Sequence, residues 1–187
     1  MHTARLKLCV FSGLLLLGLC SPATAQRGEF LKPETFAQQA FKDPASALQV
    51  LWLNKDLRRK AESILGHSYS GLRQRYWGDG TRTAWIFEEI GKELPITIGV
   101  VVENNRVHQV RILAYRESRG GEVRYPFFTR QFEQLSLIGS PEDYGLSGHI
   151  DGITGATLSV RAVSKVATLA LFFHQQTPHT EIAHVAQ

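Results

Sequence analysis

Cysteine is almost absent from the sequence. Its 187 residues include only Cys9 and Cys20, and both lie in an N-terminal segment in which Arg5 and Lys7 precede an apolar run. The segment ends in an Ala-Thr-Ala tripeptide, and the whole pattern is typical of a signal peptide over residues 1–25, cleaved after Ala25. We therefore expect a mature chain with no disulfide, no thiol chemistry and no Cys-x-x-Cys-His haem site, although export would take it to a compartment where disulfides form.

The expected leader also lacks the length of a membrane anchor. Its apolar run, from Leu8 to Leu19, is shorter than the roughly 20 residues that span a bilayer. The alternative is a lipoprotein cut before Cys20, but Leu19 occupies the position where that cleavage needs a small residue. We therefore expect an exported, periplasmic or extracytoplasmic protein.

Neither sign of charge dominates. The net charge is +4, and removal of Arg5 and Lys7 with the leader lowers it to +2. Charges alternate in sign along the chain, whereas a nucleic-acid-binding domain concentrates basic residues on one face. Arg73, Arg75 and Trp77 mix bases with aromatics as a nucleic-acid surface does, but alternating polarity in a strand explains them more simply. We expect no nucleic-acid partner.

Several motifs of enzymes and metal sites are missing. The mature chain contains no Gly-x-Gly-x-x-Gly, so no dinucleotide site is predicted. His174, His179 and His184 recur every five residues, a spacing that does not place them on one helical face, and Pro178 interrupts the helix between the first two. We expect no metal site, and spacing alone supports no Ser-His-Asp or paired-carboxylate centre.

Hydrophobic periodicity predicts an α+β fold, in which helices pack on an antiparallel sheet within a single domain over residues 26–187. Helices are expected over residues 33–41, from an Asn54 cap to Leu65, over 126–135 and over 159–175. Strands are expected over 47–53, 69–77, 81–89, 95–103 and 106–115.

Two details of packing follow from this pattern. Asn104 and Asn105 predict a two-residue hairpin turn, because asparagine tolerates the positive φ that such a turn needs. The residues expected on one sheet face are Ile96, Ile98, Val100 and Val102, opposite Val110, Ile112 and Ala114. The residues expected to be buried in the helix over 126–135 are Phe127, Phe128, Phe132 and Leu135.

The segment 151–159, Asp-Gly-Ile-Thr-Gly-Ala-Thr-Leu-Ser, is the most informative for chemistry. Gly152 and Gly155 allow a tight turn and a close approach to a ligand, and the start of the following helix favours an anion such as phosphate. The segment is either a phosphate-binding corner or an ordinary helix cap, with Thr154, Thr157 or Ser159 as the capping residue. No lysine follows the glycines, which excludes a Walker loop.

This segment resembles the signature of the covalent FMN-binding domain family, whose members include components of the sodium-pumping NADH:quinone reductase and of the Rnf complex. That signature joins an Asp-Gly pair to a Ser/Thr-Gly-Ala-Thr unit, and both occur here. The resemblance implies that FMN is bound through a phosphoester to the last threonine, Thr157. The signature residues around it are Asp151, Gly152, Thr154, Gly155 and Ala156.

The resemblance extends over roughly residues 81–175. Family members have a strand that ends in an aromatic residue, then Glu-Thr-Pro-Gly or a variant; here Tyr115 and Glu117-Ser118-Arg119-Gly120 take those places. Ser118-Arg119 stands where the subunits of the respiratory complexes have Thr-Pro, and in this respect the chain is more similar to the small free-standing exported members of the family. Glu117 and Ser118 are thus candidate FMN-binding residues, although Glu117 is equally explained as a solvated loop carboxylate. For Trp85, contact with the flavin ring and burial in the core both stay open.

The resemblance implies an exported flavoprotein that acts as an electron carrier in extracytoplasmic electron transfer, rather than a self-sufficient oxidoreductase. It implies two partners: the Mg-dependent FAD:protein FMN transferase, and a redox partner protein in or at the membrane. We expect the loops at 116–124 and 140–150 to flank the exposed edge of the flavin. The alternative is a non-redox envelope binding module in which 151–159 is only a helix cap.

Overall fold

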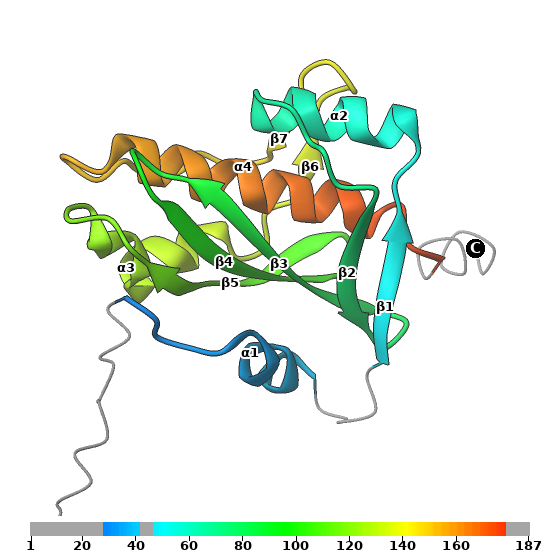
Figure 1. The fold of residues 1–187 in the computed structure, drawn as a ribbon, viewed down its shortest axis with the longest axis horizontal. Helices are drawn as coiled ribbons and strands as arrows, with labels where there is room; N and C mark the ends of the chain where they lie inside the picture. Colours follow the sequence, from blue (N-terminus) through cyan, green and yellow to red (C-terminus); the bar gives the residue numbers. More distant parts are fainter. Residues whose placement is uncertain (1–27, 42–46, 179–187) are drawn as a thin grey trace, which may run out of the picture.

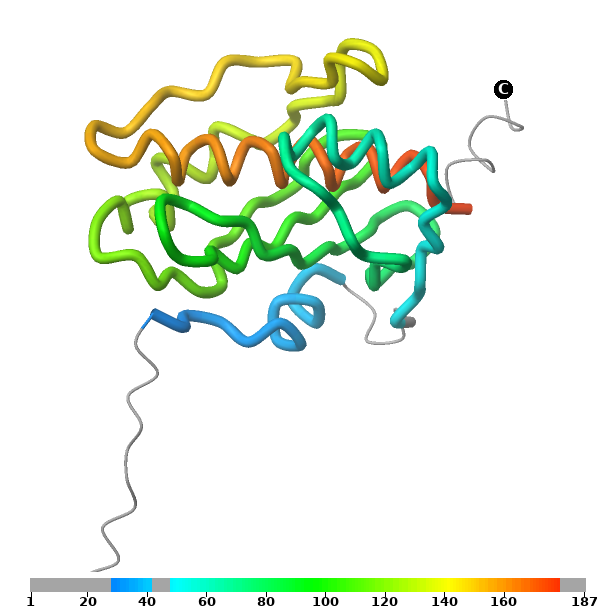
Figure 2. The backbone as a smooth tube through the Cα atoms, turned by 45° about the horizontal axis from the view of Figure 1, so that its top comes forward, coloured from blue at the N-terminus to red at the C-terminus, as the bar shows by residue number. Residues whose placement is uncertain are grey.

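A five-stranded antiparallel sheet, with strand order β1-β2-β3-β4-β5, carries helices on both faces (Figure 1). The computed structural model describes residues 28–41 and 47–178, so the expected signal peptide at 1–25 lies outside it. Helices α2 and α4 lie over one face of the sheet and α1 lies against the other (Figure 2). The expected α+β fold with helices packed on an antiparallel sheet is confirmed.

The strands of the sheet are β1 Ala47–Trp52, β2 Arg73–Gly78, β3 Arg82–Ile90, β4 Pro95–Glu103 and β5 Arg106–Tyr115. A short ribbon pairs β6 Leu137–Ile138 with β7 Gly145–Leu146. The helices are α1 Pro33–Ala40, α2 Lys55–Leu65, α3 Pro126–Thr129 and α4 Thr157–His174, and 3-10 turns span Gly121–Arg124 and Arg130–Phe132. Within residues 28–41 and 47–178, no helix is both long and apolar enough to cross a membrane.

Local sequence determines where several elements begin and end. The Asn54 side chain accepts a hydrogen bond of 2.8 Å from the Leu57 amide at the start of α2, and Gly66 ends that helix with a φ of +72°. Asn104 and Asn105 have φ values of +51° and +57°, so they form the expected two-residue turn between β4 and β5. Both predictions are confirmed.

The helix expected over 126–135 is wrong in its second half. Only α3 and one 3-10 turn form, because the following backbone bonds to β5 instead: the Gln134 amide donates to the Val107 carbonyl, and the Val107 amide donates to the Leu135 carbonyl. Phe128 is buried as expected, whereas Phe127 is 62% exposed. Hydrogen bonds to β5, a strand far away in sequence, thus replace the last turn of the expected helix.

A shift in register between β4 and β5 places Ala114 on a different face of the sheet from the one expected. Ile98 pairs with Ile112 but Thr97 pairs with Ala114, so Ala114 lies on the opposite face from the one expected. Tyr115 instead lies opposite Ile96. The side chain of Tyr115 consequently reaches the α4 side of the sheet, where its hydroxyl lies 2.9 Å from that of Ser159.

Helix α1 packs on β3, β4 and β5 through a close contact with Gly99. Phe36 is 1% exposed, and a Cβ added at Gly99 would lie 2.6 Å from its ring. The second hydrophobic cluster of the protein forms here, apart from the main core beneath α4.

We expect Gly99→Ala to destabilise the protein by about 1–3 kcal/mol, because the added methyl overpacks this contact. The control is Gly145→Ala, where a Cβ meets no atom within 4 Å. Urea unfolding measures both variants. A loss for Gly99→Ala no larger than that of the control would mean that α1 shifts without cost.

Candidate functional site

The segment singled out in the sequence forms a tight turn into α4. The Ala156 amide donates to the Ile153 carbonyl at 2.9 Å, and Gly155 has a φ of +81°, the left-handed value that such a turn requires at its third residue. Helix α4 then begins at Thr157, two residues earlier than expected, with Ala156 as its N-cap residue.

No side chain caps this helix. Thr154, Thr157 and Ser159 were the candidate caps, and none accepts a capping hydrogen bond. In the part of the chain that the structure describes, the amides of Thr157, Leu158 and Ser159 also have no acceptor. The first turn of an 18-residue helix therefore presents free N–H groups, which favour an anion.

The side chains of this first turn point in different directions. Thr157 is exposed, and Leu158 is 45% exposed. Ser159 is buried and its hydroxyl lies 2.9 Å from that of Tyr115, which donates to the Arg119 carbonyl. Burial raises the pKa of the Tyr115 phenol, so it stays protonated and able to donate. These contacts tie the end of β5 and the loop at 117–120 to the start of α4.

Gly120 closes the packing between this loop and the turn. Its φ is +82°, and a Cβ there would lie 2.9 Å from the Ala156 methyl and 2.8 Å from the Tyr115 hydroxyl oxygen. A side chain would push the loop away from α4. Only glycine satisfies both the φ and the close approach.

The Glu117 carboxylate organises the turn between β3 and β4. Its Oε1 accepts from the amides of Leu94 at 2.9 Å, Glu93 at 2.6 Å and Lys92 at 2.6 Å. These hydrogen bonds, that of Leu94 foremost, hold the pKa of Glu117 below its ordinary value of 4.5. The ionised side chain thus fixes the turn at 92–94 beside the loop at 117–120.

We expect these three amides to report the titration of Glu117. Because its pKa is lowered, the carboxylate supports the turn fully above pH 4.5 and loses that support as the pH falls through the lower, folded pKa. The amide chemical shifts of Lys92, Glu93 and Leu94, followed by NMR, should move together with a midpoint below 4.5. The same shifts should be flat in Glu117→Gln, and a midpoint at or above 4.5 in the unaltered protein would contradict the assignment.

A pocket of about 500 Å³ lies between these three segments. It is lined by Lys92, Glu93, residues 117–119 and residues 155–159. Lys92 contacts Glu93 at 3.1 Å, whereas the exposed Arg119 has no ion-pair partner among the described residues. The volume falls within the range of about 300–1,000 Å³ that is usual for small-molecule sites.

The structure brings most of the expected site residues together here. Those that line the pocket are Thr157, Gly155, Ala156, Glu117 and Ser118. Asp151, Gly152 and Thr154 are exposed in the adjoining turn and do not line it. The Asp151 amide donates to Gln131 Oε1 at 2.7 Å, so this residue anchors the entry to the turn.

Trp85 lies in the hydrophobic core and not at the pocket. It is fully buried, stacks on Tyr76 with ring centroids 4.6 Å apart, and donates from Nε1 to the Thr83 hydroxyl at 2.7 Å. The Thr83 hydroxyl in turn lies 2.7 Å from His174 Nδ1. The core interpretation of Trp85 therefore replaces the flavin contact.

The sequence did not predict the contributions of Lys92 and Glu93, and it predicted Arg119 only as part of the loop at 116–124. These three residues line the pocket from the turn between β3 and β4 and from the loop after β5. The placement of these two segments beside the start of α4 depends on hydrogen bonds between residues far apart in sequence, from the Lys92 amide to Glu117 and between the hydroxyls of Tyr115 and Ser159. Tyr115 did carry a signal, since an aromatic residue at the end of a strand was part of the resemblance.

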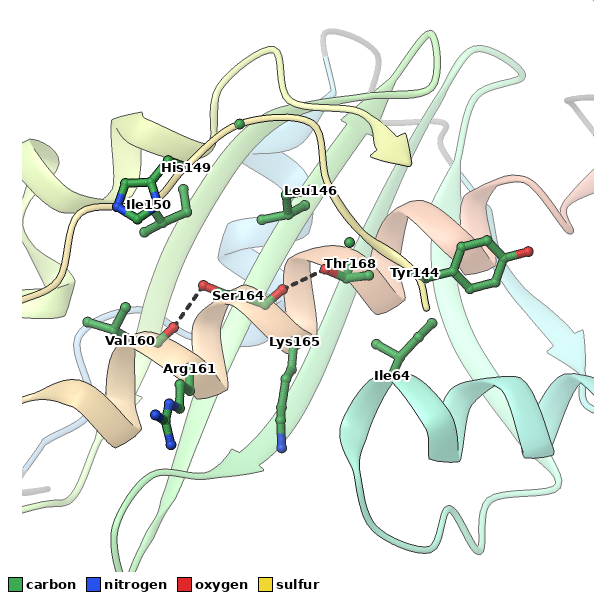
Figure 3. Close-up of a pocket in the computed structure, with 12 residues that line it drawn as sticks. Ile64, Tyr144, Leu146, His149, Ile150, Val160, Arg161, Ser164, Lys165 and Thr168 are labelled. Atoms are coloured by element: carbon green, nitrogen blue, oxygen red, sulfur yellow. Dashed lines mark hydrogen bonds between the residues drawn. The ribbon is translucent and has the colours of Figure 1, made fainter. Parts of the chain in front are cut away.

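The loop at 140–150 belongs to a different cavity, shown in Figure 3. Residues 144–146 and 148–150 line this cavity of about 430 Å³ together with α4 and Ile64, and none of them lines the Thr157 pocket. The hydroxyls of Ser164 and Thr168 donate to α4 carbonyls, and Lys165 donates to the Leu65 carbonyl. The expectation that this loop flanks the site is therefore not supported.

The described residues contain no group of three or more His, Cys, Asp or Glu side chains that could hold a metal ion. His179 and His184 lie outside these residues.

The comparison with known protein families covers all the residues that line this pocket. Residues 91–171 match the family model described as the FMN-binding domain. The match contains both the turn at 92–94 and the start of α4, and it lies within the range over which the sequence showed its resemblance. No curated protein matches the chain.

Proposed function

We propose that this protein is an exported flavoprotein with FMN joined to Thr157 by a phosphoester, and that it carries electrons between extracytoplasmic partners. The observation that supports this most strongly is the exposed Thr157 hydroxyl at the uncapped start of α4, beside a pocket. The match of residues 91–171 with the model of the FMN-binding domain supports the flavin as its cofactor.

The residues of the pocket fit FMN. Its phosphate is an anion, and the free amides of Thr157, Leu158 and Ser159 together with the positive end of α4 favour an anion at that point. Arg119 adds a positive charge without a competing ion pair among the described residues. The Leu158 side chain offers an apolar contact.

Attachment at Thr157 needs a second enzyme. The threonine hydroxyl is a weak nucleophile, and the described pocket lining contains no histidine that could remove its proton. We propose that the FAD:protein FMN transferase supplies the base and Mg²⁺. The Thr157 oxygen then displaces AMP from FAD, so that one P–O bond forms, one breaks, and the hydroxyl proton passes to the transferase.

Covalent attachment suits an exported carrier. A flavin held by affinity alone is lost by dilution outside the cell, whereas a tethered one is kept while its ring edge stays open to partners. FMN, when bound, supplies the one- and two-electron chemistry of its ring. The chain orients it: Glu117 fixes the turn at 92–94, and Tyr115 fixes the loop at 117–120.

The alternative, a non-redox envelope binding module, depended on 151–159 being only a helix cap. Its capping residue is missing, since Ala156 is the N-cap residue and makes no side-chain hydrogen bond. The visible absorbance of the mature protein, purified from a host that also exports the transferase, separates the two functions. A protein that stays colourless after co-expression would favour the binding module.

The carrier role has its own test. Stopped-flow absorbance of the flavin band should show slow reduction by NADH alone, rapid reduction by dithionite, and re-oxidation by a membrane fraction from the source organism. The mature chain has no Gly-x-Gly-x-x-Gly with which to hold a dinucleotide. Rapid turnover with NADH and no partner protein would identify an enzyme instead of a carrier.

A further inference from the structure

Helix α1 leaves part of its face of the sheet uncovered. It buries Ala84, Val101 and Leu113, whereas β1, at the edge of the sheet, keeps large apolar side chains exposed on this face. Leu48 is 51% exposed, and Trp52 is 68% exposed. These residues alternate with the buried Leu51, so the exposed ones form one stripe along β1.

Strand β2 adds two arginines to this stripe. Trp52 pairs with Arg73, Val50 with Arg75 and Leu48 with Trp77. Directly opposite residues point to the same side of an antiparallel sheet, so these six share one surface, which we call the β1–β2 face. Arg73 and Arg75 are exposed, and neither has an ion-pair partner among the described residues. Glu88, a carboxylate on the neighbouring strand β3, does not pair with either arginine; it lies 3.9 Å from the Arg116 guanidinium.

We propose that the β1–β2 face docks on a bilayer that contains anionic phospholipid. The guanidinium groups of Arg73 and Arg75 bind headgroup phosphates, for which their planar donors are suited. Trp52, Val50 and Leu48 lie at the boundary between headgroups and acyl chains, where tryptophan is favoured. Charge complementarity selects this occupant, because an apolar surface with two unpaired cations needs a partner that is both apolar and anionic.

A second copy of the chain fits this face less well. Two copies placed face to face would bring four arginines into one interface, and the face itself contributes no carboxylate to neutralise them. A nucleic acid would use the tryptophans and arginines, but the aliphatic Leu48 and Val50 offer it no stacking surface.

Docking in this way orients the proposed flavin site. Both views place the start of α4, which carries Thr157, at the opposite end of the molecule from β1 (Figures 1 and 2). The pocket is then held away from the bilayer and open to the protruding or soluble part of a redox partner. The docking itself does not depend on FMN, so it survives if the proposed function fails.

The test is co-sedimentation of the mature protein with vesicles of phosphatidylcholine alone or mixed with phosphatidylglycerol. We expect binding only to the anionic vesicles, reversed by high salt. Each arginine contributes about five-fold, so Arg73→Gln with Arg75→Gln should weaken binding by roughly 25-fold. The matched control, Arg130→Gln with Arg161→Gln, removes the same charge at exposed positions elsewhere and should bind within about three-fold of the unaltered protein.

A second pair of variants tests the apolar contacts. Trp52→Ser should weaken vesicle binding, and Ile138→Ser, which removes a side chain that is 52% exposed on β6, should not. Circular dichroism confirms that every variant is folded, and Thr157→Ala should bind vesicles as the unaltered protein does. Equal loss in the arginine pair and its control would overturn the proposal. So would binding of single-stranded DNA but not vesicles, or a stable dimer that Trp52→Ser dissociates.

Discussion

Thr157→Ala is expected to abolish the covalent flavin completely. Protein co-expressed with the transferase and denatured before intact-mass analysis should carry one FMN less one water when Thr157 is present, and no adduct when it is alanine. The reason is chemical: the exposed Thr157 hydroxyl is the oxygen of the proposed ester, and it lies on the first turn of α4 beside the pocket. Flavin fluorescence in a denaturing gel gives a second readout.

The matched control is Thr154→Ala. Thr154 is an exposed threonine three residues before Thr157, in the turn that leads into α4. It does not line the pocket, so its variant should be labelled fully. Thr157→Ser keeps a hydroxyl at the same position and should restore at least partial labelling. An adduct on denatured Thr157→Ala, or its loss in Thr154→Ala alone, would move the attachment away from Thr157.

Elements whose signals are local were predictable from the sequence. The Asn54 cap, the Gly66 stop and the Asn104-Asn105 turn each depend on side chains within a few residues, and each was found where it was expected. The end of α3 depends instead on hydrogen bonds between residues 134–135 and Val107 on a distant strand. A periodic pattern of phenylalanines cannot report such a competitor, so the helix was extended too far.

The site divides in the same way. The turn at Gly155 follows from consecutive residues, and the resemblance located it, although α4 begins two residues before the expected Ser159. The other walls of the pocket depend on the register of β4 and β5, where one shifted pair turns Tyr115 toward α4. An isolated tryptophan carries no information about which side of a sheet it occupies, so Trp85 was assigned to two environments and the core was one of them.

Gly155→Val is expected to reduce flavin loading by at least about tenfold while the domain stays folded. The reason is the backbone: Gly155 has a φ of +81°, and a residue with a Cβ is destabilised there by about 1–2 kcal/mol, more when the Cβ is branched. Steric exclusion by the protein is not the cause, because a Cβ at 155 meets no atom within 4 Å. The strain relaxes by opening the turn, which moves the neighbouring Thr157 from the position that the transferase must reach.

Two variants separate this cause from mere bulk. Gly152→Val adds the same side chain in the same exposed segment, also in open space, but at a residue without a positive φ, so it should be labelled almost normally. Gly155→Asn adds a side chain that tolerates the left-handed region and should retain most of the labelling. In-gel flavin fluorescence with circular dichroism measures loading and folding together. Full loading of a folded Gly155→Val protein, or equal losses in all three variants, would show that the left-handed turn does not position Thr157.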